Sequence, residues 1–284
     1  MTTLRTLPAW NDNYVHLLST SLAKGEKDVA VVVDPTDANV VLAALEEHSL
    51  NLRAILLTHH HPDHILGVEE LVETTGCEVI GNKNDAERLP ATRWVLPQEE
   101  FEVGPFSFRV LDVKAHTLGH IAYIFAAPVD EVIRQAHGKE PHVATELSGN
   151  GALFSGDALF LGGCGRLFEG AADNLFSSMK TFWDIEQDLL VCCAHEYTES
   201  NLKFAEHILP KGAPLDLVRE RLSKLELQGV PSVPDLLSKE KKSNPFLLCA
   251  DPTQLMLLRQ ATSLAEDASA TRIVSTLRSL KDQF

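Results

Sequence analysis

The sequence predicts an α+β protein in which a domain of alternating strands and helices precedes a small all-helical domain. In the first two-thirds of the 284 residues, short β-rich runs alternate with helical patterns, which is typical of a domain built around a sheet. From residue 201 onward the pattern is helical, with turn signals between the segments. The length allows two modest domains. We expect them over residues 1–197 and 198–284.

The first predicted elements are a strand, a helix and a second strand. Val29–Val33 is an uninterrupted apolar run that a Pro-containing turn closes, which predicts a buried strand. Asp37 then opens an amphipathic helix that continues to about His48. The strand Ala54–Leu57 follows and leads into a histidine cluster.

The remaining elements follow from the same signals. A second helix is predicted from His64 to Thr75, because Gly76 is suited to end it. Further strands are predicted at Phe106–Val113, Ile121–Ala126, Ala152–Ser155 and Leu189–Cys193. The helices of the last third are predicted at Asn201–Leu209, Leu215–Leu227, Thr253–Leu264 and Ala268–Lys281. Residues 128–150 are polar and show no clear period, so we expect a surface excursion there.

The composition excludes several classes of protein. With 25 basic and 40 acidic residues the net charge is −15, whereas a binder of nucleic acid or of an anionic membrane needs a basic surface. No stretch approaches the roughly 18 apolar residues of a membrane span, and no secretory signal is visible at the start. The five cysteines are scattered and odd in number, which indicates reduced thiols. We expect a cytoplasmic monomer.

Four of the twelve histidines lie within six positions, in the segment Thr58-His59-His60-His61-Pro62-Asp63-His64. Side chains two residues apart in an extended segment point the same way, so His59 and His61 can share one metal ion. The turn into the following helix re-aims Asp63 and His64 as ligands for a second ion. Imidazole and carboxylate ligands suit zinc, iron or manganese. His60 points away from this group and is expected to be solvated or to support it.

Three later residues of ligand type follow predicted strands. They are His116, Asp157 and His195, and the carboxyl ends of strands are where sites assemble in such sheets. Each also has an ordinary explanation, such as a hydrogen-bonded loop histidine for His116 or the nearby His120. Their recurrence together with the histidine cluster favours a two-metal site. Asp34 and Thr58 are candidates to orient the ligating histidines, or only to cap buried turns.

Through these motifs and others along the chain, the sequence resembles the metallo-β-lactamase superfamily and, within it, glyoxalase II, the hydroxyacylglutathione hydrolases. The similarity covers nearly the whole chain. It rests on Asn11-Asp12-Asn13-Tyr14, Val33-Asp34-Pro35, Thr58–His64, Ala115–His120, Ser155-Gly156-Asp157, Gly163–Gly170, His195-Glu196-Tyr197-Thr198, Asn201–Ala205 and Lys281–Phe284. The resemblance implies an αββα sandwich followed by a helical domain that binds substrate.

The resemblance also implies a ligand set and a reaction. One ion takes His59, His61 and His116, the second takes Asp63, His64 and His195, and Asp157 bridges them, so Asp63 and Asp157 are the carboxylates of the catalytic centre. We expect zinc, with iron or manganese as alternatives. Two ions about 3.5–4 Å apart hold a hydroxide that attacks a thioester carbonyl. The implied reaction is hydrolysis of S-2-hydroxyacylglutathiones, chiefly S-D-lactoylglutathione to D-lactate and glutathione, in methylglyoxal detoxification.

The same family correspondence places the substrate-binding residues. They are Arg166, Tyr197 and the basic pair Arg278 and Lys281. Residues three apart share a helix face, so the pair could clamp a carboxylate, but a cationic last helix turn is an equally ordinary reason for it. Phe168 lacks the hydroxyl of the family pattern, so no role is assigned to it. Cys164 has no base spaced to activate it, and packing is its expected role.

Three other functions remain as alternatives. A persulfide dioxygenase of the same superfamily resembles the first domain, but does not account for a helical domain that carries Arg278 and Lys281. A lactonase or β-lactamase shares the metal ligands and likewise lacks the basic pair. A non-enzymatic metal-binding protein is disfavoured because all seven ligand-type residues are present.

Overall fold

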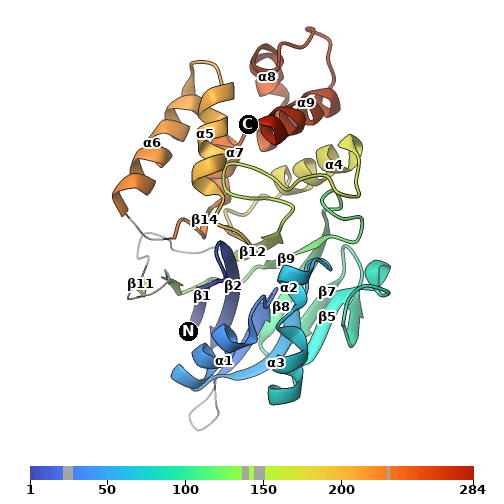
Figure 1. Ribbon diagram of the computed structural model, residues 1–284, viewed down its shortest axis with the longest axis vertical. Coiled ribbons are helices and arrows are strands. Elements are labelled where there is room, and N and C mark those ends of the chain that lie inside the picture. The colour runs from blue at the N-terminus through green and yellow to red at the C-terminus, as the bar shows by residue number, and fades with distance from the viewer. Residues whose placement is uncertain (22–27, 136–140, 144–150, 229–230) are drawn as a thin grey trace.

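The computed structural model describes residues 1–21, 28–135, 141–143, 151–228 and 231–284. Two β-sheets form the centre of the molecule and helices flank them on both sides (Figure 1). The predicted αββα sandwich with a helical C-terminal region is confirmed. Among the described helices, none combines the length and apolar character that crossing a membrane requires.

The first sheet is mixed, and its described strands have the order β11-β10-β1-β2-β3-β4-β5-β6. The strands β1 and β2 form an antiparallel hairpin, whereas β3 to β6 run parallel to one another. The bounds are β1 (Thr2–Ala9), β2 (Asn13–Thr20), β3 (Val29–Val33), β4 (Asn51–Leu56), β5 (Glu78–Asn82), β6 (Arg93–Val95), β10 (Glu131–Arg134) and β11 (His142–Val143).

The second sheet has the order β14-β13-β12-β9-β8-β7 over the described residues. All its neighbouring strands pair antiparallel except β12 and β13, which run parallel. The bounds are β7 (Glu100–Val103), β8 (Phe106–Asp112), β9 (Ile121–Phe125), β12 (Ala152–Gly156), β13 (Leu190–Cys193) and β14 (Asp235–Leu236).

Helices form the outer layers. Figure 1 shows α4 and the helices that follow residue 197 gathered on the side of the molecule away from α1 and α3. The bounds are α1 (Ala38–Glu47), α2 (Pro62–Ile65), α3 (Val68–Thr75), α4 (Ala172–Trp183), α5 (Thr198–Ile208), α6 (Ala213–Gln228), α7 (Leu237–Ser243), α8 (Leu255–Ala261) and α9 (Ala270–Gln283). Short 3₁₀ turns lie at Lys83–Asp85, Leu247–Ala250 and Pro252–Gln254.

Among the described residues, three buried apolar clusters join these layers. One lies between the sheets, one between the first sheet and α1 with α3, and one between the second sheet, α4 and the helices after residue 197. The strand β3 shows why its sequence is apolar throughout: Val29, Val31 and Val33 enter the cluster between the sheets, whereas Ala30 and Val32 pack towards α1. A strand that is covered on both faces needs apolar residues at every position.

The single helix predicted from His64 to Thr75 is wrong, because the chain breaks it into α2 and α3. The Gly67 N–H donates to the Pro35 carbonyl oxygen at 2.9 Å, and a Cβ atom on residue 67 would lie 2.6 Å from that oxygen. The Asp63 carbonyl, its partner in a continuous helix, accepts from the Thr36 hydroxyl at 2.5 Å instead. The turn after β3 thus binds both the Gly67 N–H and the Asp63 carbonyl, which would pair with each other in a continuous helix. Gly76 ends α3 in the left-handed conformation, as predicted.

The surface excursion expected over residues 128–150 is wrong for residues 131–134. They form β10, which pairs in parallel with β1, and Val132 is buried in the cluster between the sheets. The short strand β11 extends the sheet by pairing with β10. Residues 136–140 and 144–150 lie outside the described part of the chain.

The helical region remains attached to the sandwich in two ways. The strand β14 comes from this region and pairs with β13, and the third apolar cluster contains Leu153 and Val191 of the second sheet together with Leu202 and Leu277 of the helices. The helix predicted at Thr253–Leu264 is shorter, because a 3₁₀ turn precedes α8. The domain boundary near residue 197 stays a prediction.

Candidate metal centre and pocket

The candidate metal centre is built by loops that follow strands of both sheets. The strand β4 leads into residues 59–64, and β8, β12 and β13 lead into His116, Asp157 and His195. Within the described residues, the structure brings these side chains into two groups of potential ligands, His59 with His61 and His116, and Asp63 with His64 and His195. A third such group joins Asp34 to His59 and His64.

In the first group, the potential ligand atoms face one another. His116 Nε2 lies 3.0 Å from His61 Nδ1. The ring centroid of His59 lies 4.6 Å from that of His61 and 5.1 Å from that of His116. Two donors that share one tetrahedral zinc ion lie about 3.4 Å apart, since Zn–N bonds are about 2.0–2.1 Å long. The spacing therefore suits a single ion.

The second group has the same spacing and a carboxylate. His195 Nε2 lies 3.3 Å from Asp63 Oδ2, and His64 Nε2 lies 3.7 Å from it. Asp157 connects both groups: Oδ1 lies 3.4 Å from the Nε2 atoms of His64 and His195, and Oδ2 lies 3.4 Å from His116 Nε2. Asp157 thus lies where a bridging carboxylate would lie.

Several of these buried atoms lack a hydrogen-bond partner. Among the described residues, His59 Nε2, His64 Nε2 and Asp157 Oδ1 are buried without one. Buried polar atoms are normally paired, because leaving one unpaired costs free energy. Divalent cations would satisfy these atoms. The donor set and its spacing fit a binuclear site.

The opposite nitrogen of each buried histidine in the two ligand groups lies next to a neighbouring oxygen. Asp34 Oδ2 lies 2.9 Å from His64 Nδ1, and the Asp34 carboxylate accepts from the N–H and the hydroxyl of Thr58 at 2.8 and 2.6 Å. The Thr58 hydroxyl oxygen lies 3.1 Å from His59 Nδ1. Asp34 is near enough to count as a ligand, but both its oxygens are already bonded. It orients His64 and also accepts from the Thr58 N–H, so both roles that the sequence left open for Asp34 are present.

Three further orienting contacts, two to histidines and one to Asp63, were not predicted. Asp12, in the turn between β1 and β2, places Oδ1 2.9 Å from His195 Nδ1. The Arg166 carbonyl oxygen lies 2.9 Å from His116 Nδ1. Asn13 also donates to Asp63 Oδ2 at 3.1 Å. The motif Asn11-Asp12-Asn13-Tyr14 could have pointed to a role for Asp12. Only the fold shows that the turn containing Asp12 reaches His195.

His60 and His120 lie outside both ligand groups. His60 Nδ1 lies 3.1 Å from Asp85 Oδ2, and its ring is next to Arg88 and Glu169, so it points away from the centre as predicted. His120 stacks on the His59 ring at 4.5 Å, and its Nε2 accepts from the Asp157 N–H at 3.1 Å. His120 thereby supports two neighbours of the centre.

The two groups differ in charge. Burial, with His116 and His60 nearby, lowers the pKa of His61 to about 4, so it is neutral and has a lone pair to offer. Burial acts against a charged His195, but the neighbouring carboxylates of Asp157 and Asp63 raise its pKa to about 10. The carboxylates of the second group therefore stabilise positive charge near them, and bound divalent cations would supply that charge.

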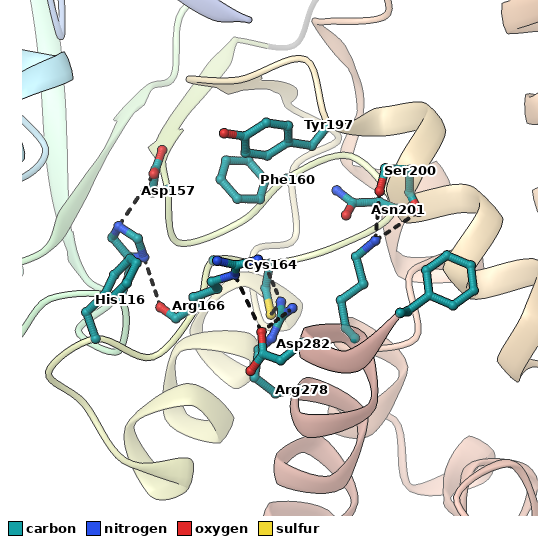
Figure 2. A pocket seen from close by; sticks show the side chains of 14 residues that line it. His116, Asp157, Phe160, Cys164, Arg166, Tyr197, Ser200, Asn201, Arg278 and Asp282 are labelled. Carbon is teal, nitrogen blue, oxygen red and sulfur yellow. Dashed lines mark hydrogen bonds and ion pairs between the residues drawn. The ribbon is translucent and has the colours of Figure 1, made fainter.

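A pocket of about 470 Å³ adjoins His116 and Asp157 (Figure 2). The four predicted substrate-binding residues, Arg166, Tyr197, Arg278 and Lys281, all line this pocket. One end is formed by the metal centre and the other by basic side chains of the C-terminal region. Figure 2 shows His116 and Asp157 on one side, with Ser200 and Asn201 of α5 across from them.

The two members of the basic pair differ in their surroundings. Arg278 is 6% exposed and donates to the Cys164 carbonyl oxygen at 2.7 Å and to Asp282 at 3.0 Å. Its guanidinium therefore holds the loop that begins at Cys164, whatever else it binds. The Lys281 ammonium is partly exposed and donates to Ser200. Burial raises the pKa of the Cys164 thiol to about 11, which disfavours a nucleophilic role, as predicted.

Phe168 lines the pocket, although the sequence predicts no role for it. It is 63% exposed, and its ring stands edge-on to His61 and His116, with centroids 5.5 and 5.1 Å away. An aromatic residue within the Gly-rich segment Gly163–Gly170 could have pointed to a role in the pocket. The loop is held by Glu169, which pairs with Arg88 and accepts from the Leu118 N–H at 2.7 Å.

Comparisons with known proteins agree with this geometry. A family model described as the metallo-beta-lactamase superfamily matches residues 19–195, and one described as the hydroxyacylglutathione hydrolase C-terminus matches residues 196–284. The chain is 38% identical to the hydroxyacylglutathione hydrolase of Photobacterium profundum and 36% identical to hydroxyacylglutathione hydrolase 2 of Vibrio vulnificus, over 286 residues and 100% of both proteins in each comparison.

A solved structure shows the same fold at lower identity. That of ETHE1 from Myxococcus xanthus matches with a TM-score of 0.58 and 22% identity, over 98% of this chain and 97% of that one. The resemblance expected from the motifs is confirmed by the family models and by the full-length relatives. The chain belongs to the hydroxyacylglutathione hydrolases of the metallo-β-lactamase superfamily.

Proposed function

We propose that this protein is a glyoxalase II enzyme that hydrolyses S-2-hydroxyacylglutathione thioesters, chiefly S-D-lactoylglutathione to D-lactate and glutathione. The observation that carries the proposal is the single pocket that joins His116 and Asp157 to the basic side chains Arg166 and Lys281. A glutathione thioester carries its reacting carbonyl on the sulfur of the central cysteine and one carboxylate on each of its two terminal residues. The pocket offers matching chemistry at its two ends.

The ligand assignment is part of the proposal. His59, His61 and His116 would hold one divalent ion, Asp63, His64 and His195 would hold the other, and the Asp157 carboxylate is close enough to both groups to serve both ions. Zinc is the first choice, and iron or manganese suits the same donors. When bound, two such ions supply an activated water and polarise the thioester carbonyl.

The chain's own residues then bind and orient the substrate. Arg166 and Lys281 attract the glutathione carboxylates against the net charge of −15. Burial, with Asp12 and Asp157 nearby, raises the pKa of Tyr197 to about 12, so its phenol stays protonated and can donate a hydrogen bond to the substrate. A thiolate is a good leaving group, so the reaction does not need a side chain as general acid.

The test combines metal analysis with an assay of thiol release. We expect about two metal ions per chain and oxygen-independent release of glutathione from S-D-lactoylglutathione. Oxygen consumption with glutathione persulfide, without thioester hydrolysis, would favour the dioxygenase instead. Bound metal without either activity would favour the metal-binding protein.

We also propose that the protein works as a monomer in the cytoplasm. All five cysteines fall in the described part of the chain and are buried free thiols, which supports a reducing compartment. Light scattering of the purified protein tests the monomer, and fractionation of cells tests the location.

A further inference from the structure

Lys281 lies between two aromatic rings at the edge of the pocket. Its ammonium nitrogen lies 5.5 Å from the centroid of the Phe204 ring and 5.3 Å from that of Phe284. The two rings stand edge to face, 5.6 Å apart, and so form two sides of an aromatic cage. Phe204 belongs to α5 and Phe284 follows α9, so the cage joins two helices that are distant in sequence.

Hydrogen bonds fix the same ammonium from another side. Lys281 Nζ donates to the carbonyl oxygen of Ser200 at 2.9 Å and to its hydroxyl at 3.0 Å. These contacts appear as dashed lines at Ser200 in Figure 2. An ammonium group has three donors, so one remains for a ligand. Because Lys281, Ser200 and Phe284 all line the pocket, that donor is available to a molecule bound there.

We propose that Phe284 is a positioning residue for substrate binding: its ring, together with Phe204, holds the Lys281 ammonium at the pocket edge for a carboxylate of the glutathione moiety. This inference rests on the proposed function. A lysine side chain has many rotamers, and a ring that restricts them lowers the entropy lost on binding. A ring face also attracts the cation directly.

The exposure of the two rings separates their roles. Phe204 is 1% exposed and belongs to the third apolar cluster, so it is needed for the fold. Phe284 is 58% exposed and leaves most of its surface to solvent. Its ring contacts are with Phe204, Lys281 and His207. Its substitution therefore tests the cage without removing a core side chain.

The electrostatics around the cage agree with this geometry. Burial, followed by the charges of Arg278 and Arg166, lowers the pKa of Lys281 to about 8. Asp282 lines the same pocket, and His207 of α5 packs against Phe284. The ammonium is thus held in a partly dehydrated place beside other cations, where an aromatic face and an incoming carboxylate both stabilise it.

The experiment compares Phe284→Ala with Phe284→Tyr, which keeps the ring, and with Met256→Ala as a matched control. Met256 is 80% exposed and does not line the pocket, so its removal tests the loss of an exposed apolar side chain elsewhere. The readouts are KM and kcat with S-D-lactoylglutathione, the dissociation constant of glutathione by calorimetry, and the pKa of Lys281 by NMR. The NMR signal of Lys281 is assigned by its loss in Lys281→Met.

For Phe284→Ala we expect KM and the glutathione dissociation constant to rise about 2- to 10-fold, the range of a cation–π contact. kcat should stay within about a factor of two, because the contact is made equally in the ground and transition states. The pKa of Lys281 should rise from about 8 towards its ordinary 10.5, because burial is the largest cause of its lowering and the admission of water outweighs the loss of the ring's attraction for the cation. Phe284→Tyr and Met256→Ala should match the wild type.

An unchanged glutathione affinity or an unchanged Lys281 pKa in Phe284→Ala would overturn the inference. So would a Phe284→Tyr variant that is as impaired as Phe284→Ala. These outcomes are distinct from failure of the proposed function, in which the wild-type protein hydrolyses no glutathione thioester. Glutathione binding and the Lys281 titration need no turnover, so they decide about the cage in either case.

Discussion

The phenol ring of Tyr197 lies parallel to the imidazole of His195, with 4.9 Å between the ring centroids and 2° between the planes. Phe160 packs edge-on against the same phenol at 5.2 Å. Tyr197 is 37% exposed and lines the pocket, so this stack links a proposed metal ligand to the wall that would contact the substrate.

Two substitutions of Tyr197 distinguish the contribution of its hydroxyl from that of its ring. Tyr197→Phe keeps the stack and loses one donor, so KM should rise about 2- to 10-fold, as expected for one hydrogen bond, while kcat and metal content stay unchanged. Tyr197→Ala removes the stack as well and should lower metal content. Thiol-release kinetics and metal analysis check both variants. Loss of metal in Tyr197→Phe would show that the hydroxyl supports the centre instead.

Asp157→Ala should lose metal and turnover together, because the carboxylate reaches both ligand groups. We expect a fall in kcat of at least about 100-fold, comparable with removing a group that stabilises transition-state charge. The surface variant Glu186→Ala is the control for loss of an acidic side chain. Two retained ions and a near-normal rate in Asp157→Ala would contradict the bridging assignment.

Arg278→Ala and Lys281→Ala should differ, although the residues lie on one helix. Removing the buried Arg278 guanidinium leaves the Cys164 carbonyl without its donor. The free energy of unfolding should fall by about 1–3 kcal/mol, and KM should rise. Lys281→Ala should raise KM about 10- to 100-fold, the range for a hydrogen bond to a charged group, with little change in stability.

Thermal unfolding and kinetics with two substrates measure these effects. The rise in KM should be large for a glutathione thioester and small for a thioester that lacks the glycine carboxylate. An equal loss on both substrates would mean that the pair supports the fold without recognising the substrate.

The pKa of Lys281, lowered to about 8, predicts a pH dependence of substrate binding. Below that pH the amine is protonated and attracts a carboxylate, and above it the charge is lost, so KM should rise with pH. Measuring KM from about pH 7 to pH 9 checks the direction. Lys281→Arg stays charged over this range and should flatten the dependence. A wild-type KM that is constant across it would argue against a contact between Lys281 and the substrate.

The ligand-type residues that follow apolar strands could be predicted from the sequence. Both the apolar run of a strand and the histidines or carboxylates after it are visible in a short local segment. The run Val29–Val33 and the cluster Thr58–His64 are each continuous in sequence, and the structure places them as strand and ligand loop. His195 was found because it follows the apolar strand β13.

Other features depend on contacts between distant segments, which no local pattern shows. The helix break at Gly67 is caused by a hydrogen bond to Pro35, and the contact between Asp12 and His195 spans 183 residues. The strand β10 has four residues, too few to show a period, and it is specified by pairing with β1. The aromatic cage around Lys281 likewise forms only when α5 and α9 meet.

The pairing of β14 with β13 has a consequence for how the chain can be divided. Only Leu190 and Val191 of β13 have partners in β14, yet these pairs cover one edge of the second sheet. An uncovered edge strand offers unpaired amide groups to other chains and promotes aggregation. A polypeptide shortened before Asp235 would leave this edge of β13 uncovered, two residues before the proposed metal ligand His195. During synthesis, this edge of β13 therefore stays uncovered until residues 235 and 236 have emerged.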